Sequence, residues 1–331
     1  MSYRRFDQDD IVVSADSITS PAWSNNAVTL TSFFTSSTQT GADSGKYYYY
    51  VYNSETAASQ EIQFAVAYAN KLGSGSALYD AGISGSSYSS TVYGQFRTLI
   101  NGDEDTNFTF DESGSSVTPN SIVALSVQRA RFKEKLLPGS LTLKLSTPSG
   151  SGILPLTDNS KDLATDTFVD AGRVYSLYSG EAGTVNNTST EYGKMYPDVG
   201  ILILNGDRLV TDGFIEGFDV SNNNTTLNNN NRIYNAISGG AHFTVRSDET
   251  LTSNFVFVRA RNSEFNYSTN PSNITGSGEL RHSVMIDNPQ GYITQVGLYN
   301  DSNDLLAVAK LSTPLLKDFT KESLIRIKLD Y

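Results

Sequence analysis

The amino-acid sequence contains no cysteine among its 331 residues. A disulfide framework is therefore excluded, and so are catalysis by a thiol and zinc or iron–sulfur sites built on cysteine. Histidine is almost as scarce, because the chain has only His242 and His282, and neither lies in a spacing typical of a metal site. We interpret both histidines as structural or surface residues, and we predict no metal and no cofactor.

Long apolar runs are also missing from the sequence. No stretch of about 18 apolar residues occurs, so no membrane-spanning segment is predicted. The opening segment Met1–Asp10 carries two arginines with no apolar stretch behind them, so we expect no secretory signal.

Positive charge is in short supply. The chain has 24 lysines and arginines against 35 aspartates and glutamates, which gives a formal net charge of −11 and a pI of about 4.7. An acidic chain is repelled by the phosphate backbone, so no nucleic-acid partner is predicted. The same charge favours solubility of the chain before it assembles with other proteins.

Motifs for catalysis are missing as well. The sequence has neither the Gly-x-Ser-x-Gly pattern of a serine nucleophile nor the His-Glu-x-x-His pattern of a zinc protease. The segment Lys71–Ser90 is rich in glycine and serine but lacks the Gly-Lys-Ser/Thr ending of a phosphate-binding loop, so it is interpreted as a long loop. We predict that the chain is not an enzyme. A pair of carboxylates close in space remains a remote alternative, because 35 acidic residues offer many such pairs.

An acidic segment, Asn101–Glu112, resembles the start of a calcium loop. Calcium loops need glycine at the sixth position and a glutamate at the twelfth, but Phe108 and Gly114 stand at those positions. The segment is therefore interpreted as a solvated acidic loop.

What the chain does have is an abundance of strand and turn formers. It contains 26 glycines, 19 tyrosines and 16 phenylalanines, together with many serines, threonines and asparagines. The fold class that we predict is mainly β, with antiparallel, sandwich-like sheets, one or two short helices and long loops. Helical spacing of apolar residues predicts a helix over Thr91–Ile100, ended by Asn101-Gly102. The asparagine-rich stretch Ser221–Asn231 is expected to be an exposed polar excursion.

The C-terminal part has the clearest strand pattern. Tyr292–Tyr299 and Leu305–Leu311 are joined by five turn-forming residues, so they predict a β-hairpin. In the final strand, Ile325, Ile327 and Leu329 alternate with charged residues, so one face is expected to be buried and the other exposed.

The predicted organisation has three parts. Residues 1–26 form an extended N-terminal arm, residues 27–120 form a β-rich domain with one helix, and residues 121–331 form a β-rich domain that ends in the hairpin and final strand. The sequence leaves open whether strands on either side of residue 120 share one sheet. It also leaves open whether the arm packs on a neighbouring subunit or covers the chain's own core.

Several aromatic and arginine side chains are candidates for contacts between subunits, because such residues are enriched in protein interfaces. The tyrosines stand together in a predicted strand, for which packing against another layer of the same chain is the alternative. The candidate interface residues are Trp23, Tyr47, Tyr48, Tyr49, Tyr50, Arg129, Arg131, Arg259 and Arg261.

Four cations, Arg129, Arg131, Lys133 and Lys135, stand at alternate positions. If this segment is extended, they share one face. On an acidic chain we expect them to pair with carboxylates of the same or a neighbouring subunit rather than with nucleic acid.

The C-terminal pattern also carries a resemblance to known proteins. The block Phe255–Ser268, the predicted hairpin strands Gly291–Asn300 and Asp304–Ser312, and the segment Pro314–Glu322 resemble a family of virion structural proteins of contractile-tailed phages, of the cyanophage type. The helical segment Tyr93–Ile100 is similar to that family as well.

This resemblance implies a non-enzymatic structural subunit of the virion, in the tail or baseplate, that acts through protein–protein contacts. Its expected partners are other virion proteins and copies of itself, and its expected location is the virion after synthesis in the host cytoplasm. Two alternatives stay open from the sequence. One is a receptor- or glycan-binding fibre module that uses the loops at 71–90 and 221–232, and the other is a polysaccharide depolymerase.

Overall fold

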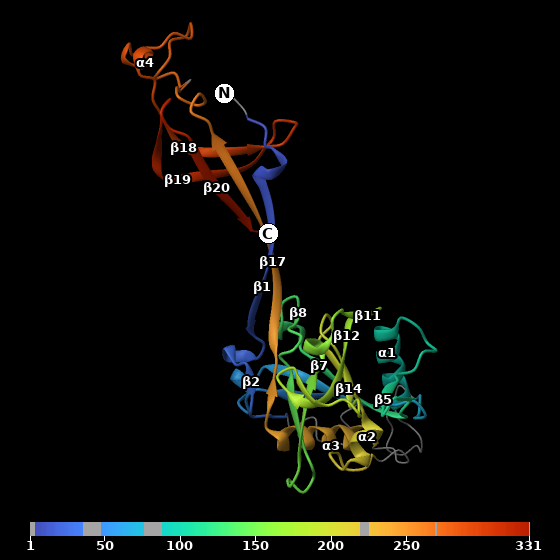
Figure 1. The fold of residues 1–331 in the computed structure, drawn as a ribbon. Helices are drawn as coiled ribbons and strands as arrows, with labels where there is room; N and C mark the ends of the chain where they lie inside the picture. The colour runs from blue at the N-terminus through green and yellow to red at the C-terminus, as the bar shows by residue number, and fades with distance from the viewer. Residues whose placement is uncertain (1–3, 36–47, 76–87, 219–224, 269, 331) are drawn as a thin grey trace. The chain divides into compact units, whose positions relative to one another are not determined.

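The structure is a computed structural model, and it describes residues 4–35, 48–75, 88–218, 225–268 and 270–330. The described residues form a mainly β chain with antiparallel, sandwich-like sheets, which confirms the predicted fold class (Figure 1). They contain four α-helices rather than the one or two expected.

The chain divides into two compact units. Unit 1 consists of Met1–Ser17 and Thr250–Tyr331, and unit 2 consists of Ile18–Glu249. The division falls within two strands, β1 (Ile11–Pro21) and β17 (Arg246–Ala260), each of which contributes residues to both units.

This division differs from the boundary predicted near residue 120. Strands on either side of that point, β4 (Ile62–Asn70) and β7 (Ser121–Val127), pair from Phe64↔Val127 to Asn70↔Ser121. Residues before and after 120 therefore share one sheet, which is the arrangement that the sequence had left open. The N-terminal arm is not a separate part either, because β1 pairs with β17.

Unit 2 is organised around one curled antiparallel sheet. Two short strands, β11 (Thr167–Val169) and β13 (Thr184–Asn187), pair with β12 (Gly172–Glu181) of this sheet, and β5 (Phe110–Glu112) and β6 (Ser115–Val117) form a separate small hairpin. The strand order of the sheet is β2 (Thr29–Leu30), β16 (Phe243–Thr244), β9 (Thr142–Ser146), β10 (Ile153–Asp158), β12 (Gly172–Glu181), β14 (Gly193–Tyr196), β15 (Ile201–Asn205), β7, β4 and β3 (Tyr49–Tyr52).

The two ends of this sheet are linked through its curl. Phe34, four residues beyond β2, forms an isolated bridge to Tyr52 of β3, with backbone N···O distances of 3.1 and 2.8 Å. Aromatic rings fill the interior next to this junction, where Phe64 lies 5.2 Å from Phe243 between ring centroids and Trp23 lies 4.8 Å from Phe243. Strands from opposite ends of the order therefore pack on one core.

Both faces of the central strands are buried. Alternate residues of β7 enter two different cores, Val123 and Leu125 one of them and Ile122 and Ala124 the other. Helix α3 (Thr225–Gly240) and the short α2 (Gly206–Thr211) cover the first face, and α1 (Ser89–Asn101) covers the second (Figure 1). Strands covered on both sides have continuous apolar sequences, which explains the unbroken run in β7.

The predicted helix is confirmed as α1, which extends the prediction by two residues at its start and one at its end. Gly102 follows it in the left-handed conformation, with φ of +74°, and its N–H donates to the carbonyl of Thr98. The residue before the helix is Tyr88, whose side chain makes no capping hydrogen bond.

The expectation of an exposed excursion at Ser221–Asn231 is wrong for its described second half. Residues from Thr225 onward belong to α3, and Asn229 and Asn230 are completely buried. The side-chain Oδ1 of Asn230 accepts a hydrogen bond of 2.6 Å from the backbone N–H of Tyr68 in β4. The pairing of β3 with β4 ends at Tyr49↔Val66, so Asn230 satisfies a donor that lies beyond the last paired residue.

Unit 1 is a two-layer β structure. In one layer β20 (Ser323–Asp330) pairs with β17 from Ala260↔Ser323 to Ser253↔Asp330. In the other, β18 (Gly291–Tyr299) and β19 (Leu305–Lys317) form the predicted hairpin, which is confirmed. Between the layers lies a small core whose buried members are Val256, Leu298, Ile325 and Ile327. The short helix α4 (Val284–Asp287) precedes the hairpin.

The hydrogen bond from Tyr68 to Asn230 gives a first test of this fold. We expect Asn230→Ala to lower the free energy of unfolding by about 1–3 kcal/mol, because a buried N–H then loses its acceptor. Asn235→Ala on the exposed side of α3 is the matched control and should stay within about 0.5 kcal/mol of wild type. Urea unfolding of both variants measures the difference, and equal stabilities would contradict the role given to Asn230.

The buried face of the last strand gives a second test. Ile327 is 6% exposed, whereas Leu324 on the opposite face of β20 is 60% exposed. We expect Ile327→Asp to destabilise unit 1 by about 4 kcal/mol or more, because it places a charge in a small apolar core. Leu329→Asp should act in the same direction, and Leu324→Asp should leave folding intact. Protease cleavage within 250–330 reports the loss, and resistance of Ile327→Asp would show that this face is not buried.

Candidate assembly surface

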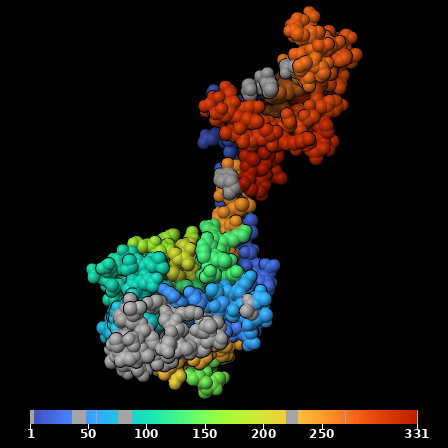
Figure 2. Space-filling view, turned by 180° about the vertical axis from the view of Figure 1, so that it is seen from behind, coloured from blue at the N-terminus to red at the C-terminus, as the bar shows by residue number. Residues whose placement is uncertain are grey.

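The outer face of the hairpin in unit 1 is apolar next to its turn, and the exposed polar pair Gln295 and Lys310 follows farther along the same face. We call Tyr299, Leu305, Leu306 and Val308 the hairpin surface. Leu306 is 68% exposed, Val308 55% and Leu305 53%. In Figure 2 the orange-red residues of this hairpin lie at the surface of the unit.

Register explains why these side chains point outward. Leu298 and Ala307 are paired and face the core, and the register shifts between Leu298 and Tyr299. This shift is a bulge, in which β19 has one residue more than β18. The extra residue is Leu306, which has no paired residue in β18 and lies outside the core. At the paired position Gly297↔Val308, a side chain on Gly297 would meet the ring of Tyr299 at 2.9 Å, so this ring covers the bare backbone.

The outer face of the other layer combines apolar and cationic side chains. We call Phe255, Phe257, Arg259, Leu324, Arg326 and Lys328 the sheet surface. They share one face, because Phe255 is paired with Lys328 and Phe257 with Arg326. The guanidinium of Arg326 lies 5.6 Å from the ring centroid of Phe255, and the ammonium of Lys328 lies 5.9 Å from it.

Exposed apolar side chains of unit 1 are therefore concentrated on the hairpin, and the other layer adds Leu324 and the half-buried Phe255 and Phe257. Single exposed apolar residues are normal on a protein surface, but groups of them usually mark sites of contact with another molecule. The loop between β17 and β18 adds further examples, with Tyr267 62%, Val284 74% and Ile286 67% exposed.

Charge distinguishes the two units. Unit 1 has ten lysines and arginines and twelve acidic residues, a formal charge of −2. The remaining −9 of the chain's −11 lies in unit 2. Copies of unit 1 therefore repel one another less than copies of unit 2 do.

Among the predicted interface residues, the aromatic ones are mostly internal. Trp23 is 2% exposed and its indole N–H donates to the carbonyl of Phe243 at 2.8 Å, and Tyr49 is 2% exposed. An interface role for these two is wrong, because both lie inside the core of unit 2. Tyr48 donates to Gln95 of α1 at 2.8 Å, Tyr50 is half-buried, and Tyr47 lies outside the described residues.

Three of the four cations at alternate positions pair with carboxylates of the chain, as expected, and Arg129 does not. Arg131 lies 2.8 Å from Glu61, Lys133 pairs with Glu249, and Lys135 lies 3.2 Å from Asp248. The segment is not fully extended, because Arg129–Arg131 form a 3-10 turn, η5. Arg129 lies over the ring of Phe132 at 4.6 Å and donates to its carbonyl.

Arg259 and Arg261 are the predicted interface residues that stay exposed in unit 1. Arg259 is paired with Leu324 at the end of the sheet surface. The backbone N–H of Arg261 donates to Glu264 at 2.9 Å, and Glu264 also pairs with Arg4 at 3.3 Å. This contact fixes the turn that follows β17 and connects it to the residues before β1.

Sequence reasoning missed most of the exposed apolar residues. Leu324 alternates in phase with Arg326 and Lys328 and so lies on the charged face of its strand. This position was the feature of the sequence that could have identified Leu324 as an exposed apolar residue. Leu305 and Leu306 directly follow the hairpin turn, and two consecutive leucines in a half-buried strand require that one of them points outward.

The titratable residues singled out in the sequence do not form a site. His242 contacts the hydroxyl of Thr244 at 3.0 Å, and burial lowers the pKa of its imidazole. In the acidic loop, the backbone N–H of Thr106 donates to Asp103 and lowers the pKa of that carboxyl. Within the described ranges, no group of three or more His, Asp and Glu side chains is placed to hold a metal ion, and no helix is long and apolar enough to span a membrane.

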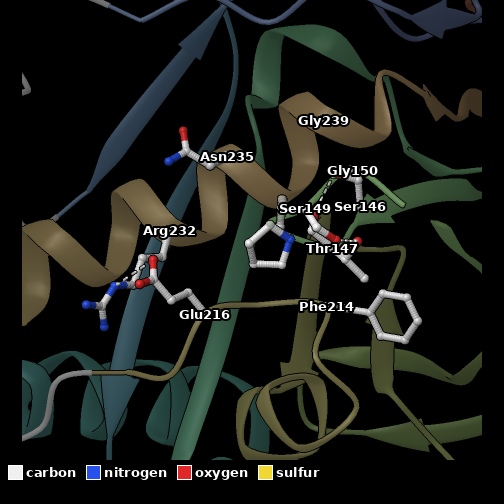
Figure 3. Close-up of a pocket in the computed structure, with 11 residues that line it drawn as sticks. Ser146, Thr147, Ser149, Gly150, Phe214, Glu216, Arg232, Asn235 and Gly239 are labelled. Atoms are coloured by element: carbon white, nitrogen blue, oxygen red, sulfur yellow. Dashed lines mark hydrogen bonds and ion pairs between the residues drawn. The ribbon is translucent and has the colours of Figure 1, made fainter. Parts of the chain in front are cut away.

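Unit 2 has an open groove of about 490 Å³ between α3 and the turn that follows β9 (Figure 3). Arg232 and Glu216 lie side by side at one end, 3.6 Å apart, and Arg232 also donates to the carbonyl of Gly217. The hydroxyl of Thr147 contacts Ser149 and accepts from the N–H of Gly152. These polar groups are engaged within the chain, so we assign no ligand to the groove.

Comparisons of the chain with protein-family models, with curated proteins and with solved structures find no match.

The ion pair between Lys135 and Asp248 gives a test of how the basic segment is held. Both side chains are nearly buried, so we expect Lys135→Met to cost about 3–5 kcal/mol by leaving Asp248 without this partner. Adding Asp248→Leu should recover most of that loss, because neither charge then remains buried. Chemical unfolding of both variants measures it, and a single variant as stable as wild type would contradict the pairing.

Proposed function

We propose that this chain is a structural subunit of a tailed-phage virion, located in the tail or baseplate. It acts through protein–protein contacts rather than through catalysis. The observation that carries this proposal is the concentration of exposed apolar side chains in unit 1, most of them on the hairpin and the loop before it, with Leu324 on the other layer.

The resemblance in the sequence supports the same part of the chain. The segments that resemble virion structural proteins, 255–268 and 291–322, contain the last six residues of β17 together with β18 and β19, and all of them lie in unit 1. Family resemblance and exposed apolar surface therefore coincide in one unit.

Leaving these side chains in water has a cost that contacts between subunits remove. Each apolar side chain transferred from water into an interface contributes about 1.5–3 kcal/mol when its burial is complete. A stable interface needs about 800 Å² from each partner, with an apolar centre and a polar rim. Unit 1 presents such residues on two faces, so its partners in the particle are other virion proteins and copies of itself.

The chain is made in the host cytoplasm and incorporated into the particle there. Its charge of −11 is consistent with this sequence of events, because repulsion between copies of unit 2 keeps the free chain soluble until unit 1 meets its partners.

The proposal is tested by incorporation into particles. Purified virions should contain the chain in several copies per particle, measured by quantitative mass spectrometry. We expect the double variant Leu306→Lys/Val308→Lys to fold normally and to be lost from virions, because both substitutions charge the hairpin surface. Leu72→Lys in unit 2, at a residue that is 75% exposed, is the matched control and should be incorporated at the wild-type level.

Absence of the wild-type chain from purified virions would contradict the proposed function. Incorporation of the double variant at the wild-type level would show that the hairpin surface is not the part that assembles.

A further inference from the structure

We propose that the partner of unit 1 is unit 1 of a second copy of this chain, with the hairpin surface of one copy docked on the sheet surface of the next. This pairing presupposes the assembly role proposed above and names its partner. It is carried by opposite charges on two exposed apolar faces of one unit.

The hairpin surface ends in an acidic turn. Asp301 and Asp304 lie in the five-residue turn between Tyr299 and Leu305, and both are exposed. The turn is held by Asn300, whose side-chain amide donates to Asp304 at 3.0 Å and whose Oδ1 accepts from the N–H of Asp304 at 2.8 Å. Asp301 makes no ion pair within the described part of the chain, so its charge is available to a partner.

The sheet surface carries the opposite charge. Arg259, Arg326 and Lys328 lie on it with one carboxylate, Asp330, which pairs with Lys328 at 3.0 Å. Arg259 and Arg326 have no carboxylate partner among the residues that the structure describes. Two cations thus remain beside the apolar Leu324, and the two carboxylates lie in the turn that directly precedes Leu305 and Leu306.

The two surfaces face away from each other. The inner residues of the hairpin, such as Leu298, pack on the inner residues of the β17–β20 pair, such as Ile325 and Ile327. The hairpin surface and the sheet surface are therefore the outer faces of the two layers. One copy can use both faces at once, without either interfering with the other.

This arrangement determines the kind of assembly. Contact between two different patches of identical chains is heterologous, so each added copy leaves one free patch at each end. Such contacts build a ring when the rotation between copies closes and a filament when it does not. A second copy is favoured over a different protein because the complementary partner face is supplied by the chain itself.

The decisive experiment mixes two variants of the purified full-length chain. Leu306→Lys places a cation opposite the cationic sheet surface, and Leu324→Asp places a carboxylate opposite the acidic turn. Wild type should form oligomers in sedimentation-velocity analysis, and each variant alone should associate at least about tenfold more weakly, because like charges then face each other. An equimolar mixture should contain a complex of one copy of each variant, since each retains the face that the other lacks.

A charge exchange gives a second readout that does not alter the apolar contacts. Asp301→Lys and Arg326→Glu should each weaken association by about tenfold, and both changes in one chain should restore it, because the charges then match in reverse. Association of wild type should also weaken as salt rises from about 50 mM to about 500 mM. Circular dichroism and thermal unfolding check that every variant is folded.

Three outcomes would overturn the inference. The first is a wild-type chain that stays monomeric at high concentration, even if it is found in virions. The second is a mixture of the two variants that forms no complex. The third is a double charge exchange that does not recover association. Virion incorporation of wild type is measured separately, so failure of this pairing and failure of the proposed function can be told apart.

Discussion

Strand alternation in unit 1 is the constraint on which its surface depends. Successive side chains of a strand point to opposite faces, so a two-layer unit can bury only one face of each strand. In β20 the buried residues Ile325 and Ile327 alternate with exposed Leu324, Arg326 and Lys328. The core takes the inner set, and the outer set is free to serve contacts. An apolar residue in the outer set, such as Leu324, therefore contributes little to the fold of the isolated chain.

In unit 2, by contrast, both faces of the central strands are buried. Helices α1 and α3 cover both faces of its central strands, so β7 buries Val123 and Leu125 on one side and Ile122 and Ala124 on the other. Most of the chain's negative charge also lies in this unit. In the proposed assembly, the acidic unit 2 keeps the free chain soluble and the near-neutral unit 1 makes the contacts with partners.

Periodicity in the sequence predicted the mainly β class, the helix α1, the hairpin β18–β19 and the buried face of β20, because each of these depends on local alternation or spacing. Periodicity did not predict the burial or exposure of residues whose position depends on partners far away in the sequence. The polarity of Asn229 and Asn230 suggested solvent, but a distant strand supplies Tyr68 N–H as a partner and draws this part of α3 into the core. Trp23 was a candidate interface residue, with a place in the chain's own core as the open alternative, and Phe64 and Phe243, far away in the sequence, enclose it in that core. The outward position of Leu306 follows from a bulge, which strand periodicity does not encode.

The most direct test of the assembly surface is a cryo-electron microscopy map of the virion in which the chain can be traced. Neighbouring subunits should cover the outer faces of both layers of unit 1, with Leu306 and Leu324 buried in contacts and Asp301 close to a cationic side chain of the next subunit. A map in which both faces are open to solvent, while unit 2 makes the contacts between subunits, would contradict the role given to unit 1.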